Sequence, residues 1–347
     1  MNALITAALC RLNRIANRPF LLPLLVFYPT SRCNSRCLSC AWWTHSGEDD
    51  LTLAEIEELA GALPALGTRL VLISGGEPLL RPDLFSIARL FRAQGAQLWL
   101  LTSGLALGRH ADQVAACFSR VTISLDASTP ALYRTVRGVD GLEAVEAGVR
   151  RLKALAPHLP ITARATLHRL NYRDLPHIVD RARAMGLDGV SFLAADLTTT
   201  AFGRREPPED GLLRLSPQEV ADFRAVVEAT LVSHRDAFAS GFIAERPEKL
   251  RRLPRYYAAL AGQEAFPPVA CNAPWVSVVV EADGTVRPCF FHRPLGNVRE
   301  QPLVQIVREA LPAFWKELDV ATNPLCRRCV CSLRIGRKGW RRLTADR

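Results

Sequence analysis

Three cysteines lie close together near the amino-terminal end of the chain, at Cys33, Cys37 and Cys40. Their spacing puts three thiols on one short loop, with no fourth cysteine near them. Thiolates are soft ligands that favour iron–sulfur clusters, zinc or Cu(I). A closed structural zinc site takes four ligands, whereas three thiolates on a four-iron cluster leave one iron open to bind and reduce another molecule. A zinc knuckle or a group of redox-active cysteines is the alternative interpretation.

A glycine-rich turn follows this loop in the sequence. The apolar run from Leu70 to Ile73 is typical of a buried strand, and it leads into Ser74-Gly75-Gly76-Glu77-Pro78. Paired glycines permit a tight turn and a close approach of the backbone to a ligand. Glu77 and exposed backbone groups of such a turn can receive a cationic amine.

The cysteine triplet and the glycine turn together resemble the signature of radical S-adenosylmethionine (SAM) enzymes. In that family the open iron of a [4Fe–4S] cluster binds the amino and carboxylate groups of SAM. The reduced cluster cleaves SAM to methionine and a 5′-deoxyadenosyl radical, which abstracts hydrogen from a substrate. The resemblance implies that the three cysteines hold the catalytic cluster, and that Gly75, Gly76 and Glu77 hold the SAM amine.

Further SAM contacts are expected where other strands end. Ser103 follows Thr102 in a position where many family members have Thr-Asn-Gly, and Ser124 and Asp126 would meet the ribose or the carboxylate of SAM. Arg164 is expected to pair with that carboxylate, because a guanidinium suits bidentate contacts. For each of these the alternative is an ordinary polar residue at a strand end.

One position departs from the family pattern. Many members have an aromatic residue just before the third cluster cysteine, where it packs on adenine, but this chain has Ser39 there. Trp42 or Trp43 is a candidate to replace it. The adenine contact is thereby put in doubt, whereas the cluster is not.

A second group of cysteines lies near the carboxyl end, together with a hairpin signal at Asp283-Gly284. It comprises Cys271, Cys289, Cys326, Cys329 and Cys331. Their spacing resembles the SPASM/twitch auxiliary-cluster domain, in its shorter form with one auxiliary [4Fe–4S] cluster. The resemblance implies that the first four are ligands, with Cys331 as an alternative fourth. A structural zinc ribbon is the alternative, because four thiolates suit either metal.

The elements that must position these residues alternate between strand and helix. Apolar runs predict strands near 23–28, 69–73, 97–101, 120–125, 161–167 and 189–193, with helices near 52–63, 82–93, 108–117, 142–154 and 172–185. This alternation predicts an α/β fold with a parallel sheet, whose carboxyl strand ends carry the chemistry. The family resemblance sharpens this to a partial (β/α)6 TIM-like barrel, followed by a small Cys-rich β-hairpin/helix domain.

The expected organisation has five parts. They are a helical extension at 1–21, the barrel at 22–196, a connecting segment at 197–268 with helices near 216–234 and 246–262, the auxiliary domain at 269–335, and a basic tail at 336–347.

Composition narrows the class of protein. The 347 residues are 49% hydrophobic, enough for a large core, and no apolar stretch reaches the roughly 20 residues of a membrane-spanning helix. At the amino terminus apolar residues come before Arg11, whereas a signal peptide has basic residues before its apolar ones. A cytoplasmic location is therefore expected. The first 18 residues predict a lid helix on the barrel, with a weak membrane-surface contact as the alternative.

The net charge of +10 fits either an acidic partner or an arginine-rich composition with a solvated tail. A nucleic-acid-binding zinc protein is disfavoured, because no single element gathers basic and aromatic residues.

The leading hypothesis is a radical SAM oxidoreductase that acts on a small-molecule or peptide substrate, with an external electron donor such as flavodoxin or ferredoxin. A peptide maturase with a separate leader-binding partner is one alternative, since only about 20 residues precede the first strand. A non-catalytic iron–sulfur carrier or scaffold is the other, although a carrier needs no amine site at Gly75-Gly76-Glu77. No catalytic residue can be assigned from the sequence.

Overall fold

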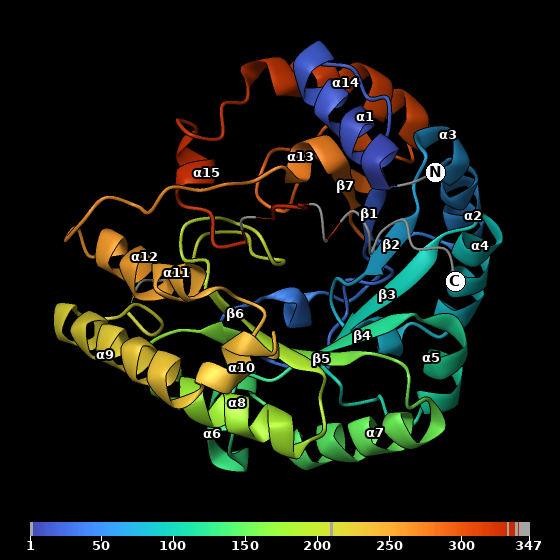
Figure 1. Cartoon of the computed structure of the whole chain (residues 1–347). Helices are drawn as coiled ribbons and strands as arrows, with labels where there is room; N and C mark the ends of the chain where they lie inside the picture. Colours follow the sequence, from blue (N-terminus) through green and yellow to red (C-terminus); the bar gives the residue numbers. More distant parts are fainter. Residues whose placement is uncertain (1–2, 209–210, 332, 337–338, 340–347) are drawn as a thin grey trace.

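A nine-stranded sheet forms the centre of the computed structural model, which describes residues 3–208, 211–331, 333–336 and 339. The strand order is β6-β5-β4-β3-β2-β1-β7-β8-β9, and β1 to β6 run parallel. The sheet curves without closing, so the predicted partial barrel is confirmed (Figure 1). The strands are β1 (Leu24–Phe27), β2 (Leu70–Ile73), β3 (Gln97–Thr102), β4 (Arg120–Ser124), β5 (Ile161–Leu167), β6 (Gly189–Ala194), β7 (Ser277–Val280), β8 (Thr285–Arg287) and β9 (Gly296–Asn297).

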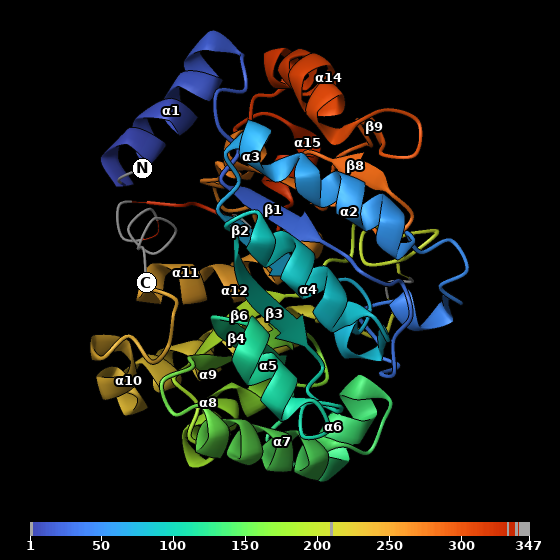
Figure 2. The same cartoon turned by 90° about the vertical axis from the view of Figure 1, so that its right-hand side faces the viewer.

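Helices cover the outer face of the curved sheet, as α2, α4, α5 and α7 show in Figure 2. Thr52 begins α2 with a capping box, because its hydroxyl accepts the Glu55 N–H while the Glu55 carboxylate accepts the Thr52 N–H. The helices of the barrel are α2 (Leu53–Gly61), α3 (Leu63–Leu66), α4 (Leu84–Ala93), α5 (Ala111–Cys117), α6 (Pro130–Arg137), α7 (Leu142–Leu155) and α8 (Leu175–Ala184).

Side chains of the strands alternate between the helix-covered core and the inner face of the barrel. In β5 the residues Ile161, Ala163 and Leu167 are fully buried in the core, whereas Arg164 and its neighbours on the opposite face are more exposed. Polar side chains on that inner face therefore line the interior, which is where the carboxyl ends of the strands can present chemistry.

Helices between the barrel and the carboxyl-terminal region differ from the sequence prediction in one respect. The predicted helix near 216–234 is present as α9 (Pro217–Ser233), and α10 (Arg235–Ala239) follows it. The single helix predicted over 246–262 is instead divided into α11 (Pro247–Leu250) and α12 (Arg252–Leu260). Pro254 lacks the N–H that a continuous helix would donate to the Leu250 carbonyl, which explains the division.

The predicted hairpin forms around Asp283-Gly284, with β7 and β8 antiparallel. Its first strand also pairs with β1, where Leu24 lies opposite Ser277, so the hairpin continues the sheet of the barrel. Three helices accompany it: α13 (Ala273–Val276), α14 (Leu303–Glu317) and α15 (Pro324–Arg327).

The amino-terminal helix α1 (Ala3–Ala16) packs against this region. The buried Asn13 amide donates hydrogen bonds to the carbonyls of Leu21 and Trp275, at 2.7 and 2.8 Å. The lid helix thus rests on α13, and a membrane-surface contact stays a prediction. Among the described residues, no helix combines the length and the apolar character needed to cross a membrane. Most of the basic tail at 336–347 lies outside the described residues.

Candidate metal and SAM site

The cysteine triplet lies on the loop that leaves the carboxyl end of β1. Burial raises the pKa of the Cys33 thiol to about 11 and that of Cys40 to about 12. The thiols also lie close enough to act on each other, since the charges of Cys37 and Cys33 add to the raised pKa of Cys40. Thiols in this state give up their protons to a bound metal, because the thiolate is the ligand.

The spacing of the donors bears on the kind of metal group. In the described part of the chain, no three His, Cys, Asp or Glu side chains are gathered closely enough to share one metal ion. A tetrahedral zinc with bonds of about 2.3 Å would need sulfurs roughly 4 Å apart. The identity of the metal group at these thiols stays a prediction.

The glycine turn is fastened to the cysteine loop by backbone contacts. The Gly76 N–H donates to the Thr30 carbonyl at 3.0 Å, and the Glu77 N–H donates to the Arg32 carbonyl at 2.7 Å. Gly75 has φ of 106°, which side-chain-bearing residues rarely adopt. A Cβ on Gly76 would lie 2.1 Å from the Arg32 carbonyl oxygen, so both glycines are required by close approach.

Replacing Gly76 by alanine should disrupt this contact. The new methyl group meets backbone, not a flexible side chain, so the loop that carries Cys33 must shift. Overpacking of this kind costs about 1–3 kcal/mol, and we expect weaker SAM binding as well as a lower urea midpoint, both measurable on the reconstituted protein.

Gly61→Ala is the matched control, because a Cβ at Gly61 meets nothing within 4 Å. It should leave SAM binding unchanged and stability the same or slightly higher. Wild-type SAM affinity and stability in Gly76→Ala would contradict the contact described here.

The Glu77 side chain is turned into the protein and is fully buried. Its carboxylate accepts hydrogen bonds from the Leu79 N–H, the Thr102 hydroxyl and the Ser103 N–H, at 3.0, 2.7 and 2.5 Å. A carboxylate offers about four acceptor positions, so about one remains for an external donor. Glu77 therefore ties the ends of β2 and β3 together, and its contact with the SAM amine stays a prediction.

The other residues expected to bind SAM have different surroundings. The Ser103 hydroxyl donates to the Asn34 side chain at 3.2 Å, which links the end of β3 to the cysteine loop. Ser124 and Arg164 are directly paired in the register of β4 and β5, and the Arg164 guanidinium donates to the Ser191 hydroxyl at 3.2 Å. The structure thus brings Ser124 and Arg164 together on the inner face of the sheet.

Asp126 is occupied by partners within the protein. Its carboxylate forms a buried ion pair with Arg137 at 2.9 Å and accepts the Thr166 N–H at 2.7 Å. Arg137 ends α6 and also donates to the Ser35 hydroxyl at 3.3 Å, inside the cysteine loop. Its charge acts on Cys37, where it opposes the rise in pKa that burial causes. Asp126 therefore holds the arginine that supports the loop, and its contact with SAM stays a prediction.

Arg137 was not predicted from the sequence to take part in the site. The helix that carries it was not assigned, although Pro130 is the expected first-turn residue of that helix. The α6 residues also hold the loop through backbone, since the Arg36 N–H donates to the Arg137 carbonyl at 2.8 Å and the Leu38 N–H donates to the Val136 carbonyl at 3.2 Å.

Residues 196–205, here called the strap, follow β6 and lie against the cysteine loop. The Phe202 carbonyl accepts the Ala41 N–H at 3.0 Å and lies 3.5 Å from the Cys40 sulfur. Phe202 has φ of 65°, an uncommon conformation for a residue with a side chain. A buried ion pair between Arg204 and Asp196, at 3.3 Å, fixes the base of the strap.

The two tryptophans considered for the missing aromatic position are placed differently. Trp42 is buried, with its ring 5.7 Å from that of Tyr28, and the strap glycine Gly203 packs on it. Trp43 is more exposed, and its indole N–H donates to the Cys40 carbonyl at 3.0 Å. Trp42 therefore packs between the loop and the strap, and neither contact decides where adenine lies.

Three of the carboxyl-terminal cysteines lie close enough to act on one another. Cys271, Cys289 and Cys326 act on one another electrostatically, and burial raises the pKa of Cys289 to about 12 and that of Cys326 to about 11. The His292 ring nitrogen Nε2 lies 3.3 Å from the Cys326 sulfur, a neighbour that the sequence did not single out as a partner of the cysteines. These three cysteines form one potential donor group.

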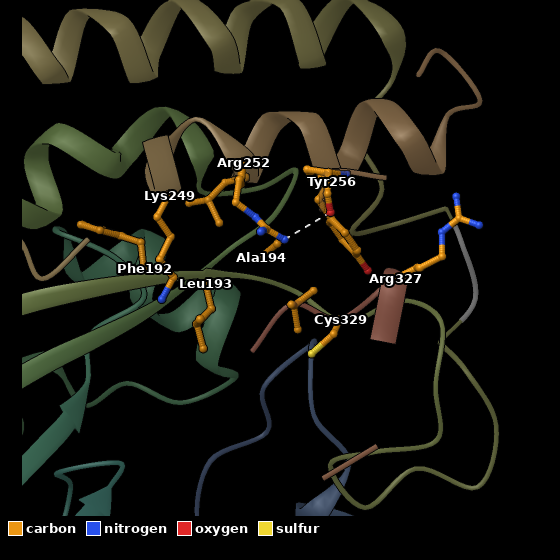
Figure 3. Close-up of a pocket in the computed structure, with 11 residues that line it drawn as sticks. Phe192, Leu193, Ala194, Lys249, Arg252, Tyr256, Arg327 and Cys329 are labelled. Carbon is orange, nitrogen blue, oxygen red and sulfur yellow. Dashed lines mark hydrogen bonds between the residues drawn. The ribbon is translucent and has the colours of Figure 1, made fainter. Parts of the chain in front are cut away.

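Cys329 and Cys331 have further neighbours. Cys329 and Leu193 both line a pocket beside β6 (Figure 3). The positive charges of Arg164 and Lys249 oppose the rise in pKa that burial causes at the Cys331 thiol. The charge of Cys331 in turn helps to raise the pKa of Cys271. The choice of a fourth ligand between Cys329 and Cys331 stays a prediction.

Comparison with known families and proteins agrees with these features. Residues 27–182 match the radical SAM superfamily, and residues 271–330 match SPASM, described as an iron–sulfur cluster-binding domain. The chain is 36% identical over 132 residues to a probable GTP 3′,8-cyclase of Thermococcus kodakarensis, a match that spans 37% of the chain and 43% of that relative.

Two relatives match over most of this chain. Pre-heme d1 synthase of Dinoroseobacter shibae is 29% identical over 332 residues, spanning 88% of this chain and 78% of the relative. Fe-coproporphyrin III synthase of Methanosarcina barkeri is 26% identical over 309 residues, spanning 82% and 73%.

The fold is also that of SuiB from Streptococcus suis, solved with bound S-adenosylmethionine and with its precursor peptide SuiA. The peptide-bound structure superposes with a TM-score of 0.66 at 16% identity, covering 92% of this chain and 74% of that one.

Proposed function

We propose that this chain, which belongs to the radical SAM superfamily and has a SPASM match, is an oxidoreductase that uses SAM, with one catalytic and one auxiliary [4Fe–4S] cluster. One observation carries the proposal. Three mutually interacting thiols lie on a loop that is fastened by backbone hydrogen bonds to a Gly-Gly-Glu turn. That arrangement joins a metal donor set to a place where a ligand can approach backbone closely.

In this proposal Cys33, Cys37 and Cys40 hold the catalytic cluster. When bound, the cluster would supply one electron to SAM, and the chemistry gained would be hydrogen abstraction from a substrate C–H bond. The residues of the chain position these groups: Gly75 and Gly76 let the ligand lie against backbone, and Glu77 orients the turn with one acceptor position left for the amine. The strap covers Cys40 and limits the entry of water.

The auxiliary cluster is assigned to Cys271, Cys289 and Cys326, with Cys329 or Cys331 as the fourth ligand. Its role would be to accept an electron from the substrate or to anchor the substrate. A net two-electron oxidation would need an external electron donor for the catalytic cluster, such as flavodoxin or ferredoxin.

For the substrate we propose a tetrapyrrole with carboxylate side chains. The two relatives that match over more than four fifths of this chain are named for products of this class. The GTP 3′,8-cyclase match covers 37% of the chain, so it says less about the region around the auxiliary cysteines. A peptide substrate, with a separate leader-binding partner, is the alternative, since the peptide-bound neighbour shares the fold.

The proposal is tested by measuring 5′-deoxyadenosine from SAM, with anaerobically reconstituted protein and a strong reductant. Wild-type protein should form the product, and a Cys40→Ala variant should form none above background, because one of the three ligands is missing. No product from iron-loaded wild-type protein, with either a tetrapyrrole or a peptide extract present, would instead support an electron carrier or scaffold.

A further inference from the structure

We propose that Lys249 and Arg252 bind a carboxylate of the substrate, in the pocket that separates β6 from the carboxyl-terminal cysteines. The inference rests on the proposed function, because it locates part of the substrate of that same enzyme. It adds a binding site and two residues that would select for negative charge.

The pocket lies where three segments distant in sequence meet. Phe192 to Ala194 of β6 form one side, α11 and α12 supply Lys249 and Arg252, and Cys329 lies on the wall beyond. Its cavity volume is about 20 Å³, which suits one small group such as a carboxylate and not a whole ligand. Figure 3 shows the Lys249 and Arg252 side chains extending from the helices towards β6, whereas the Arg327 side chain extends away from them.

The two cations of this pocket have few acidic neighbours: Lys249 has the single carboxylate of Glu245, and Arg252 has none among the described residues. The Lys249 ammonium has Glu245 as its acidic neighbour, at 3.8 Å, which is beyond hydrogen-bond distance. The Glu245 carboxylate is itself buried and accepts the Phe192 N–H at 3.0 Å. Lys249 therefore keeps its hydrogen-bond donors for a ligand.

Hydrogen bonds to backbone carbonyl groups position the Arg252 side chain. Its guanidinium donates to the Pro268 carbonyl and, at 3.5 Å, to that of Pro267. No carboxylate forms an ion pair with it among the residues that the structure describes. A half-buried guanidinium without an acid is the setting in which an added carboxylate gains most.

The remaining walls of the pocket are apolar or aromatic. Leu193, Leu253 and Tyr256 line it, and Tyr256 packs on Phe266 with ring centroids 5.9 Å apart. A pocket with apolar walls and two cations fits the end of a molecule that has a hydrophobic body and a carboxylate arm. A tetrapyrrole with acidic side chains has that character, whereas a neutral one does not.

The test is equilibrium dialysis of cluster-loaded protein against metal-free coproporphyrin III, a fluorescent tetrapyrrole with four carboxylate arms. Wild-type protein should bind it, and binding of the tetramethyl ester in the same mild detergent should be much weaker. A charge-assisted hydrogen bond contributes roughly 1.5–3 kcal/mol, so Lys249→Gln and Arg252→Gln should each raise the Kd by about tenfold or more.

Arg255→Gln is the matched control. It removes the same charge from α12, but Arg255 pairs with Glu264 at 3.5 Å and does not line the pocket. Its Kd should remain that of the wild type, which separates the pocket from the general positive charge of the surface.

Two outcomes would overturn the inference. Unchanged affinity in Lys249→Gln and Arg252→Gln, with a shifted auxiliary-cluster potential, would show that the cations only balance the charge of the cluster. No binding by wild-type protein that still forms 5′-deoxyadenosine would reject the carboxylate pocket and leave the SAM chemistry standing. If the wild-type protein formed no 5′-deoxyadenosine, that result would instead reject the proposed function.

Discussion

Replacing Cys33, Cys37 and Cys40 together by alanine should remove about half of the bound iron and all SAM cleavage. The thiols form one donor group on a single loop, whereas the carboxyl-terminal cysteines form another group that does not depend on it. The auxiliary cluster should therefore assemble without the catalytic one. Iron and sulfide analysis, electron paramagnetic resonance of the reduced protein and 5′-deoxyadenosine formation measure the three quantities on the same sample.

The reciprocal variant provides the comparison. Alanine at Cys271, Cys289 and Cys326 should remove the other half of the iron and leave SAM cleavage measurable. Cys117→Ala should keep all the iron, because Cys117 lies on α5, in neither cysteine group. Full iron content in the first triple variant would show that those three thiols are not ligands.

Arg137→Met should destabilise the protein by about 3–5 kcal/mol, because it leaves the Asp126 carboxylate buried without its partner. Both side chains are about 8% exposed, so solvent cannot replace the lost interaction. The loop that carries Cys37 should also loosen, since Arg137 donates to Ser35. We expect a lower urea midpoint in the apoprotein and a changed paramagnetic resonance spectrum of the catalytic cluster.

Two further variants test this explanation. Asp126→Leu combined with Arg137→Met removes both charges and should recover much of the lost stability. Arg134→Met is the matched control on the same helix, where an exposed pair with Asp140 at 3.6 Å contributes at most about 1 kcal/mol. Equal losses in Arg134→Met and Arg137→Met would contradict a special role for the buried pair.

Much of the fold was predictable because its signals are local. Each of the six predicted strands is present, since an apolar run bounded by turn residues specifies a buried strand within a few residues of chain. The Thr52 capping box and the Asp283-Gly284 hairpin were predictable for the same reason. The division between α11 and α12 at Arg251 was not predicted, because the apolar pattern of a single helix continues across that residue in spite of Pro254.

The roles of polar side chains were less predictable than their positions. Glu77 and Asp126 were both expected to face SAM, yet their carboxylates are largely used by Ser103 and Arg137. A carboxylate at a strand end accepts whichever donors the folded chain brings nearest, and those donors come from other strands and helices. The sequence marks such a residue as polar and well placed without specifying its partner.

The sequence by itself determined that three thiols lie together on one loop, because they fall within eight residues of the chain. It also determined the glycine turn, since the tight approach there depends on the absence of two side chains. Only the tertiary structure decided what surrounds these groups: α6 beneath the cysteine loop, the strap across Cys40, and a cationic pocket beside Cys329. Each of these joins segments far apart in the chain, and their contacts arise from packing around a common core that no local pattern records.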